Sequence, residues 1–466
     1  MPTLSPNPRV CVIGAGISGL TSVKALLDLN LTSDRNLSCT CYEASDRVGG
    51  LWAFGNAGGN SAAYRSLFIN TSRDRMQLRD FPMPREYPDY PHHELIGRYL
   101  RAYAEQFQLQ RSIRLNTRVT RVGPNPSGGF SVTTCPSRKT SDSEARKGGA
   151  PPPATSPDTT TEHFDAVIVA NGHHFSPRFP RPAPKGAFAG TTLHSHSYVD
   201  PQNPCDLSGK RVIVVGFGNS AVDIACELAR EPARAQVYLS VRRGAWVLPR
   251  YALGRPLDQV TLGSGLLPRA ITQPLAELWY RVAIGDVTRF GLPQPDHGLG
   301  DAHPTMSDEL LPMIGKGRIV AKPQIDRYEG NDVVFADGSR ESIDAIVFAT
   351  GYDVSFPFFE SSFVSAPDNE LPLYLHVFAP EISGLYFVGL CQPLGPIFPL
   401  AEAQAKLIAR HVAGHYSLPS VEQMRRATQR ERALMRRRFG SSARHTMQVD
   451  FDTYLSSLNR ELERSA

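Results

Sequence analysis

The chain has 466 residues, 41% of them hydrophobic and 20% charged, with a formal net charge of +5. This length exceeds what a single hydrophobic core usually serves, so we expect two domains. The charge excess is too small to require a nucleic-acid partner. Seven scattered cysteines indicate reduced thiols in a cytoplasmic location rather than a disulfide framework.

We expect neither a targeting segment nor a membrane segment at the ends of this sequence. The first apolar run, 10–13, leads directly into a glycine-rich turn rather than into a cleavage site. No apolar stretch approaches the roughly 18 residues needed to span a bilayer. Because the last residues, 459–466, are also strongly charged, we expect no transmembrane anchor.

The first elements in chain order are a strand over 9–13, a turn, a helix over 18–30 and a strand over 38–43. The turn has the spacing of a dinucleotide-binding loop: Gly14, Ala15, Gly16, Ile17, Ser18 and Gly19. Glycines permit the tight turn and the approach of a pyrophosphate to the helix N-terminus. Glu43 ends the second strand, where an acid accepts from ribose hydroxyls. This segment therefore predicts a nucleotide site.

The next region predicts a helix over 93–107 and paired strands over 113–122 and 129–135. Residues 136–161 consist mainly of Ser, Thr, Pro, Gly and Lys, without an aromatic residue. Such a composition buries too little surface to offset its ordering entropy, so we expect a disordered surface insertion. A buried strand follows over 164–172.

A second nucleotide unit begins with a strand over 211–215 and continues with a helix over 220–230. Its loop is Gly216, Phe217, Gly218, Asn219, Ser220 and Ala221. The next strand, 236–241, ends not in an acid but in Arg242 and Arg243. Guanidinium groups pair with a ribose 2′-phosphate, which favours NADPH over NADH. Two arginines on a solvated turn are the alternative.

The C-terminal half predicts a helical region over 266–290 and strands over 343–349 and 384–388. Residues 266–284 are expected to pack as a helix in the core, with contact to a membrane surface as the alternative. Two strands end in a glycine, Gly172 and Gly351. We interpret each glycine as a point where the chain crosses from one domain to the other. Two such crossings predict that the second nucleotide domain is inserted within the first.

A fingerprint then resembles that of the class B flavin-dependent monooxygenases: Phe188-x-Gly190-x-x-x-His194-x-x-x-Tyr198. Four further segments resemble motifs of this family in its order: 49–52, 70–72, 348–352 and 392–395. The resemblance extends over about 9–420. The chain looks most like the soluble, bacterial-type members, because the membrane anchor of the animal members is not found.

The resemblance implies an α/β fold of two Rossmann-like dinucleotide-binding domains, with the NADPH domain inserted into the FAD domain. The expected boundaries are 1–172 and 341–466 for FAD binding and 173–340 for NADPH binding. Asn70 would lie beside the flavin C4a as the catalytic residue. The other residues implied at the cofactors, besides the two loops, are Glu43, Gly50, Leu51, Trp52, Thr71, Asp223, Arg242, Arg243 and Gln392. His194 and Tyr198 are expected to organise the linker, with a catalytic role as the alternative.

The implied activity is an NADPH- and O₂-dependent oxygenation of soft nitrogen or sulfur atoms through a C4a-hydroperoxyflavin. The substrate would be a small amine or sulfide, and a homodimer is possible. Baeyer–Villiger oxidation of ketones is the alternative within the oxygenases, although Tyr198 is followed by Val199 rather than by the Trp-Pro of that group. Two classes outside the oxygenases fit the paired loops less well: a flavin disulfide reductase and a non-catalytic nucleotide-binding redox protein. No metal is expected, since adjacent histidines (His92-His93, His173-His174) rarely chelate one ion together.

Overall fold

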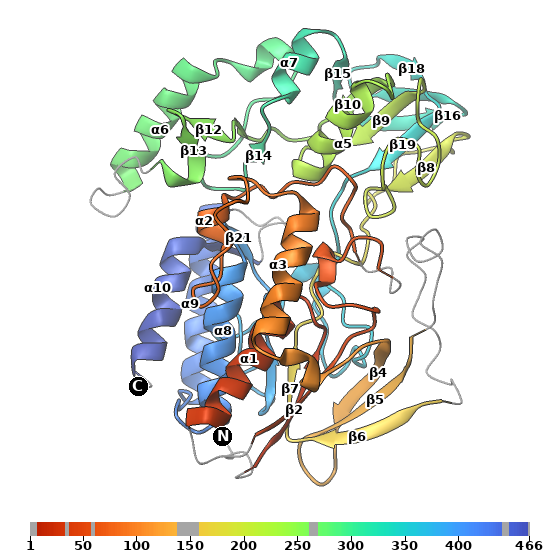
Figure 1. Ribbon diagram of the computed structural model, residues 1–466. Helices are drawn as coiled ribbons and strands as arrows, with labels where there is room; N and C mark the ends of the chain where they lie inside the picture. The colour runs from red at the N-terminus through yellow and green to blue at the C-terminus, as the bar shows by residue number, and fades with distance from the viewer. Residues whose placement is uncertain are drawn as a thin grey trace. The chain divides into compact units, whose positions relative to one another are not determined.

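The computed structural model describes residues 7–32, 37–56, 61–137, 158–260, 269–439 and 447–464. The chain forms two compact units (Figure 1). Unit 1 consists of residues 1–61, 73–176 and 353–466, and unit 2 consists of 62–72 and 177–352. In sequence, unit 2 therefore interrupts unit 1, which confirms the expected insertion of one domain into the other.

Unit 1 is built around a parallel sheet. Its elements are β1 (Arg9–Ile13), α1 (Ile17–Thr32), β2 (Ser38–Tyr42), η1 (Gly50–Trp52), α2 (Arg73–Met76), α3 (His93–Gln106), η2 (Leu109–Ser112), β3 (Ile113–Arg114), β4 (Thr117–Pro124), β5 (Phe130–Pro136), β6 (Thr160–Phe164), β7 (Ala166–Val169), η5 (Pro367–Asn369), β20 (Leu385–Phe387), β21 (Gln392–Leu394), α8 (Phe398–Val412), α9 (Val421–Phe439), β22 (Gln448–Asp450) and α10 (Phe451–Arg464). The order of the parallel sheet is β20-β7-β1-β2-β3.

The two faces of this sheet are covered differently. Helix α1 packs on one face and contacts α8, which in turn contacts α10. On the other face, Cys11 and Ile13 of β1 pack with Val119 and Val132 of the antiparallel sheet β4-β5-β6. Because both faces are buried, the strands are almost continuously apolar, as in other doubly wound folds.

Unit 2 repeats this plan. Its elements are β8 (Thr191–His194), β9 (Arg211–Val215), α5 (Asn219–Ala229), β10 (Gln236–Ser240), β11 (Val247–Leu248), β12 (Tyr251–Ala252), β13 (Arg255–Pro256), η3 (Leu257–Gln259), α6 (Arg269–Ala283), η4 (Val287–Phe290), β14 (Thr305–Met306), α7 (Leu310–Gly315), β15 (Ile319–Lys322), β16 (Ile325–Glu329), β17 (Asp332–Phe335), β18 (Arg340–Ser342) and β19 (Ala345–Phe348). The parallel sheet has the order β15-β10-β9-β19-β8.

The core of unit 2 follows the alternation of its central strand β9. Val212 and Val214 pack with Val222 of α5 on one face. Ile213 packs with Val333 of the antiparallel sheet β16-β17-β18 on the other. Both units therefore place a parallel sheet between a helix and a three-stranded antiparallel sheet, which confirms the expected α/β class with two dinucleotide-binding domains.

The fingerprint segment forms the edge of the second sheet. Its residues 191–194 are strand β8, which pairs with β19. A Cβ on Gly190 would lie 2.5 Å from the carbonyl oxygen of Asp344, so only glycine allows this approach. The His194 ring contacts those of Phe179 and Tyr352, and the Tyr198 hydroxyl donates to Glu227 at 2.9 Å. These contacts fit the expected structural role of His194 and Tyr198.

The unit boundaries differ from the expected ones in two places. Strand β19 was expected in the flavin domain, but it pairs with β9 and belongs to unit 2, which extends to Tyr352. Residues 62–72 also belong to unit 2, although the neighbouring residues in the sequence lie in unit 1. Contacts in space with unit 2, rather than position in the sequence, underlie both assignments.

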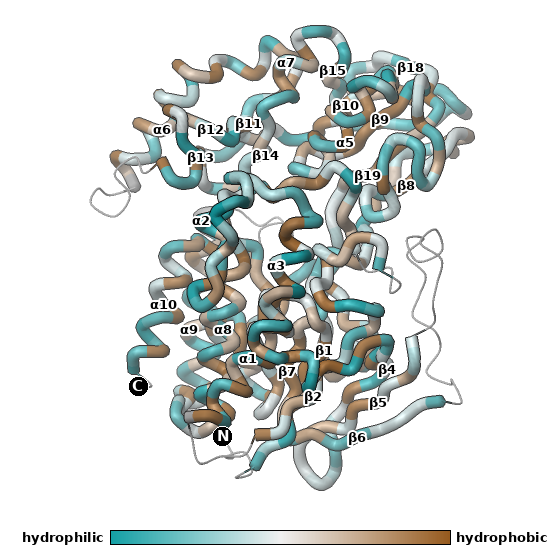
Figure 2. The backbone as a smooth tube through the Cα atoms, viewed as in Figure 1, coloured by the Kyte–Doolittle hydropathy of each residue, from teal (hydrophilic) through white to brown (hydrophobic). Residues whose placement is uncertain are grey.

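Two expectations about surface segments also need correction. Strand β5 continues through Pro136 and β6 begins at Thr160, paired with it, so the expected insertion over 136–161 is shorter; residues 138–157 lie outside the described ones. Helix α6, which carries hydrophobic residues among hydrophilic ones in Figure 2, exposes an apolar stripe, so the expected core packing of 266–284 is wrong for this face. The stripe consists of Ile271, Leu275, Leu278 and Val282. Residues 266–268 lie outside the described ones.

No helix within the described ranges is long and apolar enough to cross a membrane.

Candidate functional site

The loop of unit 1 connects β1 to α1, and two of its three glycines lie closely against backbone. Gly14 has a φ of +100°, and a Cβ there would lie 2.7 Å from the carbonyl oxygen of Ala170. A Cβ on Gly19 would lie 1.8 Å from the carbonyl oxygen of Gly14. The turn can therefore carry only glycine at these positions, as a dinucleotide-binding loop requires. Helix α1 then begins at Ile17, with the unpaired N–H groups of its first turn available to an anion.

The segment 49–52 lies directly on this loop. The N–H of Gly49 donates to the carbonyl oxygen of Ala15 at 2.9 Å. A Cβ on Gly50, whose φ is +56°, would lie 2.9 Å from the Cα of Gly16. The indole of Trp52 has an edge contact with the ring of Phe398, with centroids 6.4 Å apart. Two motifs separated in the sequence are thus brought together at one edge of the sheet.

Glu43 at the end of β2 binds the same loop. Its Oε2 accepts from the N–H of Ala15 at 2.7 Å, and its Oε1 accepts from the N–H of Ser45 at 2.8 Å. Burial raises the pKa of Glu43, although these two N–H groups act in the opposite direction. Each carboxylate oxygen has a second lone pair for a ribose hydroxyl, so the loop contacts are compatible with the predicted role.

The segment that follows β20 reaches the loop at Gly389, a position that sequence reasoning missed. A Cβ on Gly389, whose φ is +76°, would lie 2.2 Å from the Ser18 Oγ. Its N–H donates to the side chain of Gln404 at 2.8 Å. Gln392 follows three residues later as the first residue of β21, and its N–H donates to the carbonyl oxygen of Met447 at 2.7 Å. The signal for Gly389 was a glycine directly after a buried strand.

The loop of unit 2 has the same construction between β9 and α5. Gly216 has a φ of +132°, and a Cβ there would lie 2.5 Å from the carbonyl oxygen of Ala349. Ala221, which replaces the third glycine, is fully buried at the helix start, whereas Ser220 is exposed. The Asn219 Oδ1 accepts from the N–H of Met306 at 2.8 Å, so this side chain also holds the loop in place.

The two arginines after β10 differ in their surroundings. Arg243 donates twice to the Asp296 Oδ2, from Nε at 2.9 Å and from Nη2 at 2.7 Å. The hydrogen bond from His297 and then Arg243 lower the pKa of Asp296. Arg242 is exposed, and the described part of the chain offers its guanidinium no ion pair. Arg242 is therefore the more available partner for a phosphate.

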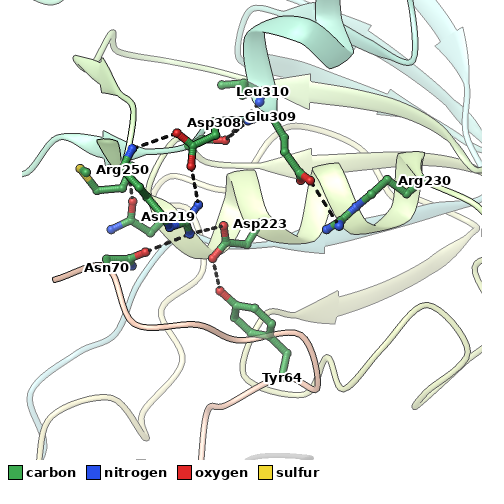
Figure 3. A network of polar contacts seen from close by, with 11 residues as sticks. Tyr64, Asn70, Asn219, Asp223, Arg230, Arg250, Asp308, Glu309 and Leu310 are labelled. Atoms are coloured by element: carbon green, nitrogen blue, oxygen red, sulfur yellow. Dashed lines mark hydrogen bonds and ion pairs between the residues drawn. The ribbon is translucent and has the colours of Figure 1, made fainter. Parts of the chain in front are cut away.

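Asn70 belongs to a polar network within unit 2 (Figure 3). Its Oδ1 accepts from the Arg250 Nη2 at 3.4 Å. The same guanidinium lies 3.4 Å from the Asp308 Oδ2 and 3.9 Å from the Asp223 Oδ1. The Arg250 side chain is 19% exposed, so this is a largely buried cation between two carboxylates. Thr71 follows Asn70 in the same segment.

Asp223 lies in α5, and its carboxylate accepts a hydrogen bond from a tyrosine. The Tyr64 hydroxyl donates to its Oδ2 at 2.5 Å, as Figure 3 shows. Burial raises the pKa of Asp223 to about 6, although the Tyr64 hydrogen bond and the Arg250 charge oppose this shift. The predicted contact of Asp223 with NADP would therefore compete with Tyr64, a partner that the sequence did not indicate.

One histidine pair can be described as a possible cation site. Ligand atoms of His92, His93 and Glu94 lie within 4.8 Å of one another. His92 already serves as the N-cap of α3, since its Nδ1 accepts from the N–H of Glu94 at 3.4 Å. This arrangement is typical of a helix start, and the absence of a metal from the chemistry of this chain stays a prediction.

The family model of flavin-binding monooxygenase-like proteins matches residues 7–465. A flavin-containing monooxygenase 5 of Rattus norvegicus is 35% identical over 95% of this chain and 80% of its own length. A dimethylaniline monooxygenase [N-oxide-forming] 2 of Oryctolagus cuniculus is 35% identical over 97% of this chain and 82% of its own length. The structure of an S-allyl-L-cysteine S-oxygenase from Allium sativum superposes with a TM-score of 0.69, at 24% identity over 99% of this chain and 90% of that one.

These matches cover nearly the whole chain, including both glycine loops and the fingerprint between them. They confirm the resemblance that the motifs indicated. The chain belongs to the flavin-binding monooxygenase-like family.

Proposed function

We propose that this monooxygenase binds FAD in unit 1 and NADPH in unit 2, and oxygenates soft nitrogen or sulfur atoms of small molecules with O₂. The observation that carries the proposal is the pair of glycine loops. Gly14 and Gly19 in one unit, and Gly216 in the other, each occupy a position where a Cβ would collide with backbone. Two intact dinucleotide loops in a flavin monooxygenase fit one flavin and one nicotinamide cofactor. Relatives named for N-oxide formation and S-oxygenation support the substrate class.

The residues around each loop fit these cofactors. In unit 1, Glu43 is suited to accept from a ribose, and the turn that contains Gly50, Leu51 and Trp52 follows Gly49, which donates to the loop that would hold the pyrophosphate. In unit 2, exposed Ser220 at the start of α5 and exposed Arg242 are suited to phosphate groups. Arg243 is a weaker candidate, because Asp296 already binds it.

Reduced flavin supplies the activation of O₂ and the transfer of one oxygen atom when it is bound. The chain then needs to bind, to orient and to exclude water. Asn70 suits this task because an amide donates a hydrogen bond without releasing an acidic proton. The glycine loops orient the two dinucleotides, and no paired acids or nucleophilic triad are required for such chemistry.

Baeyer–Villiger oxidation of ketones is the second candidate, and one observation favours it. That reaction needs a cation beside the reacting oxygen, and Arg250 contacts Asn70. However, Asp223 and Asp308 lie 3.9 and 3.4 Å from the same guanidinium and offset its charge. We therefore favour nitrogen and sulfur oxygenation. Product analysis with a sulfide and a ketone under identical conditions distinguishes the two.

The cysteines argue against a flavin disulfide reductase. That chemistry needs a reactive thiolate and a partner thiol. Burial raises the pKa values of Cys11 and Cys41, and raises that of Cys39 to about 12. Burial therefore disfavours the thiolate form of these three cysteines. All seven cysteines are free.

Replacement of Asn70 tests the proposed catalytic role. Asn70→Ala should raise the fraction of consumed NADPH that ends as hydrogen peroxide, because the amide donor is lost. Arg65→Ala is the matched control in the same segment, since it removes the ion pair of an exposed arginine side chain with Asp200. Unchanged coupling in Asn70→Ala would exclude the role assigned to this residue.

A homodimer and a cytoplasmic location stay predictions, to be tested by light scattering and cell fractionation.

A further inference from the structure

We infer that Arg250 is a positioning residue that turns the Asn70 amide so that its NH₂ group, rather than its oxygen, is presented to ligands. The inference rests on the proposed function only for the identity of those ligands. It concerns contacts within unit 2 alone (Figure 3).

The orientation of the amide follows from donor chemistry. A guanidinium has five N–H donors and no acceptor, so the atom of Asn70 that faces Arg250 must be the carbonyl oxygen. The Oδ1 does lie 3.4 Å from the Arg250 Nη2. The opposite edge of the amide then carries the two N–H donors. A reversed amide would place N–H against N–H and lose the contact.

Arg250 is itself held by its neighbours. Its backbone N–H donates to the Asp308 Oδ1 at 2.9 Å, and its Nη1 lies 3.4 Å from the Asp308 Oδ2. The Asp223 carboxylate lies on another side, 3.9 Å away. A planar guanidinium bound by carboxylates has few alternative positions, so it can fix the atom that accepts from it.

The segment that carries Asn70 is attached to unit 2 on both sides of this residue. Tyr64 donates to Asp223 in α5 at 2.5 Å. The N–H of Ser72 donates to the Asp258 Oδ2 at 2.7 Å, and the Gln259 Nε2 donates to the Ser72 Oγ at 3.2 Å. Asn70 is thus held by the domain that carries the second glycine loop, because α5 begins directly after that loop.

The test compares Arg250→Met and Arg250→Lys with Arg230→Met. Arg230 is the matched control, since it is an arginine of the same unit whose Nη1 pairs with the Glu309 Oε1 at 3.4 Å (Figure 3). Hydrogen–deuterium exchange of the holoenzyme measures how firmly 62–72 is held. Loss of a charged hydrogen bond should speed this exchange by about tenfold in Arg250→Met, less in Arg250→Lys and not in Arg230→Met. If Arg250→Met does not fold, the exchange rate of Arg250→Lys is compared with that of Arg230→Met instead.

A double-mutant cycle separates positioning from a direct role. The peroxide fraction should rise in Arg250→Met and should rise no further in Arg250→Met/Asn70→Ala than in Asn70→Ala alone, because Arg250 acts through Asn70. Partial rescue by Arg250→Lys is expected, since a lysine can still donate to the Oδ1. Additive effects, or exchange equal to that of Arg230→Met, would overturn the inference. If no variant, nor the natural chain, oxygenates any substrate, the proposed function fails, and the exchange measurement still decides the role of Arg250.

Discussion

Arg243 and Asp296 form a close ion pair at the end of β10, with two hydrogen bonds of 2.9 and 2.7 Å to one carboxylate oxygen. The adjoining Arg242 is exposed to solvent. Two arginines that are equivalent in the sequence are therefore unequal in the structure. A ribose 2′-phosphate would have to displace Asp296 to use Arg243, whereas Arg242 can meet it directly.

Arg242→Ala should reduce the preference for NADPH over NADH more than Arg243→Ala does. A hydrogen bond to a charged group contributes about 1.5–3 kcal/mol, so we expect kcat/KM for NADPH to fall by about tenfold or more in Arg242→Ala. The value for NADH serves as the internal control and should change little. A larger loss in Arg243→Ala would show that Asp296 yields to the phosphate.

Gly19→Ala should prevent FAD retention. The new Cβ would lie 1.8 Å from the carbonyl oxygen of Gly14, so the loop or α1 must move. Overpacking of this kind costs about 1–3 kcal/mol or more. Gly123→Ala is the matched control, because a Cβ there meets nothing within 4 Å. The flavin absorbance per protein after gel filtration is the measurement, and normal flavin content in Gly19→Ala would contradict the assignment of this loop.

Asp223 should make the protein less stable as the pH rises through about 6. Burial raises its pKa from 3.8 to about 6, so the folded protein binds this proton more tightly than the unfolded chain. The ionised Asp223 therefore lowers the free energy of unfolding. This destabilisation is complete above pH 6 and fades as the pH falls toward 3.8. Asp223→Asn still accepts from Tyr64 but does not titrate. The Tm of Asp223→Asn minus that of the natural chain should increase between about pH 4.5 and about pH 7.5. Thermal melts spaced about one pH unit apart measure this difference. A constant difference would contradict the raised pKa.

His194 should make the protein less stable as the pH falls, the opposite of the dependence expected for Asp223. Burial lowers its pKa from 6.5 to about 4, so the unfolded chain binds this proton more tightly than the folded protein. Stability is therefore lost as the pH falls from 6.5 toward 4. His194→Asn keeps an acceptor for the N–H of His196, which donates to the His194 Nδ1 at 3.1 Å. Thermal melts across this range should show a shallower loss in His194→Asn, and parallel curves would disprove the buried neutral histidine.

The parallel sheets and their loops were predictable because local chemistry determines them. The apolar runs 9–13 and 211–215 are strands β1 and β9, and each is followed by glycines that the turn requires. The order of motifs also identified the family. Such signals lie in contiguous residues, so they can be recognised in one sequence without knowledge of the fold.

The remaining features depend on contacts between distant residues. Tyr64 and Asp223 are 159 residues apart, and Asn70 and Arg250 are 180 apart, so no local pattern indicates that 62–72 belongs to unit 2. The same holds for Arg243 and Asp296. Strand β19 was assigned to the wrong domain because an apolar strand can extend either sheet, and only its pairing with β9 decides.

Oxygen-isotope labelling of the product tests the central claim most directly. The purified protein would be supplied with NADPH, ¹⁸O₂ and a thioether or tertiary amine, and product, peroxide and NADPH would be quantified together. The account predicts one ¹⁸O atom in each sulfoxide or N-oxide, with product equal to the NADPH consumed. Consumption of NADPH with all oxygen recovered as hydrogen peroxide, across amines, sulfides and ketones, would contradict an oxygenase.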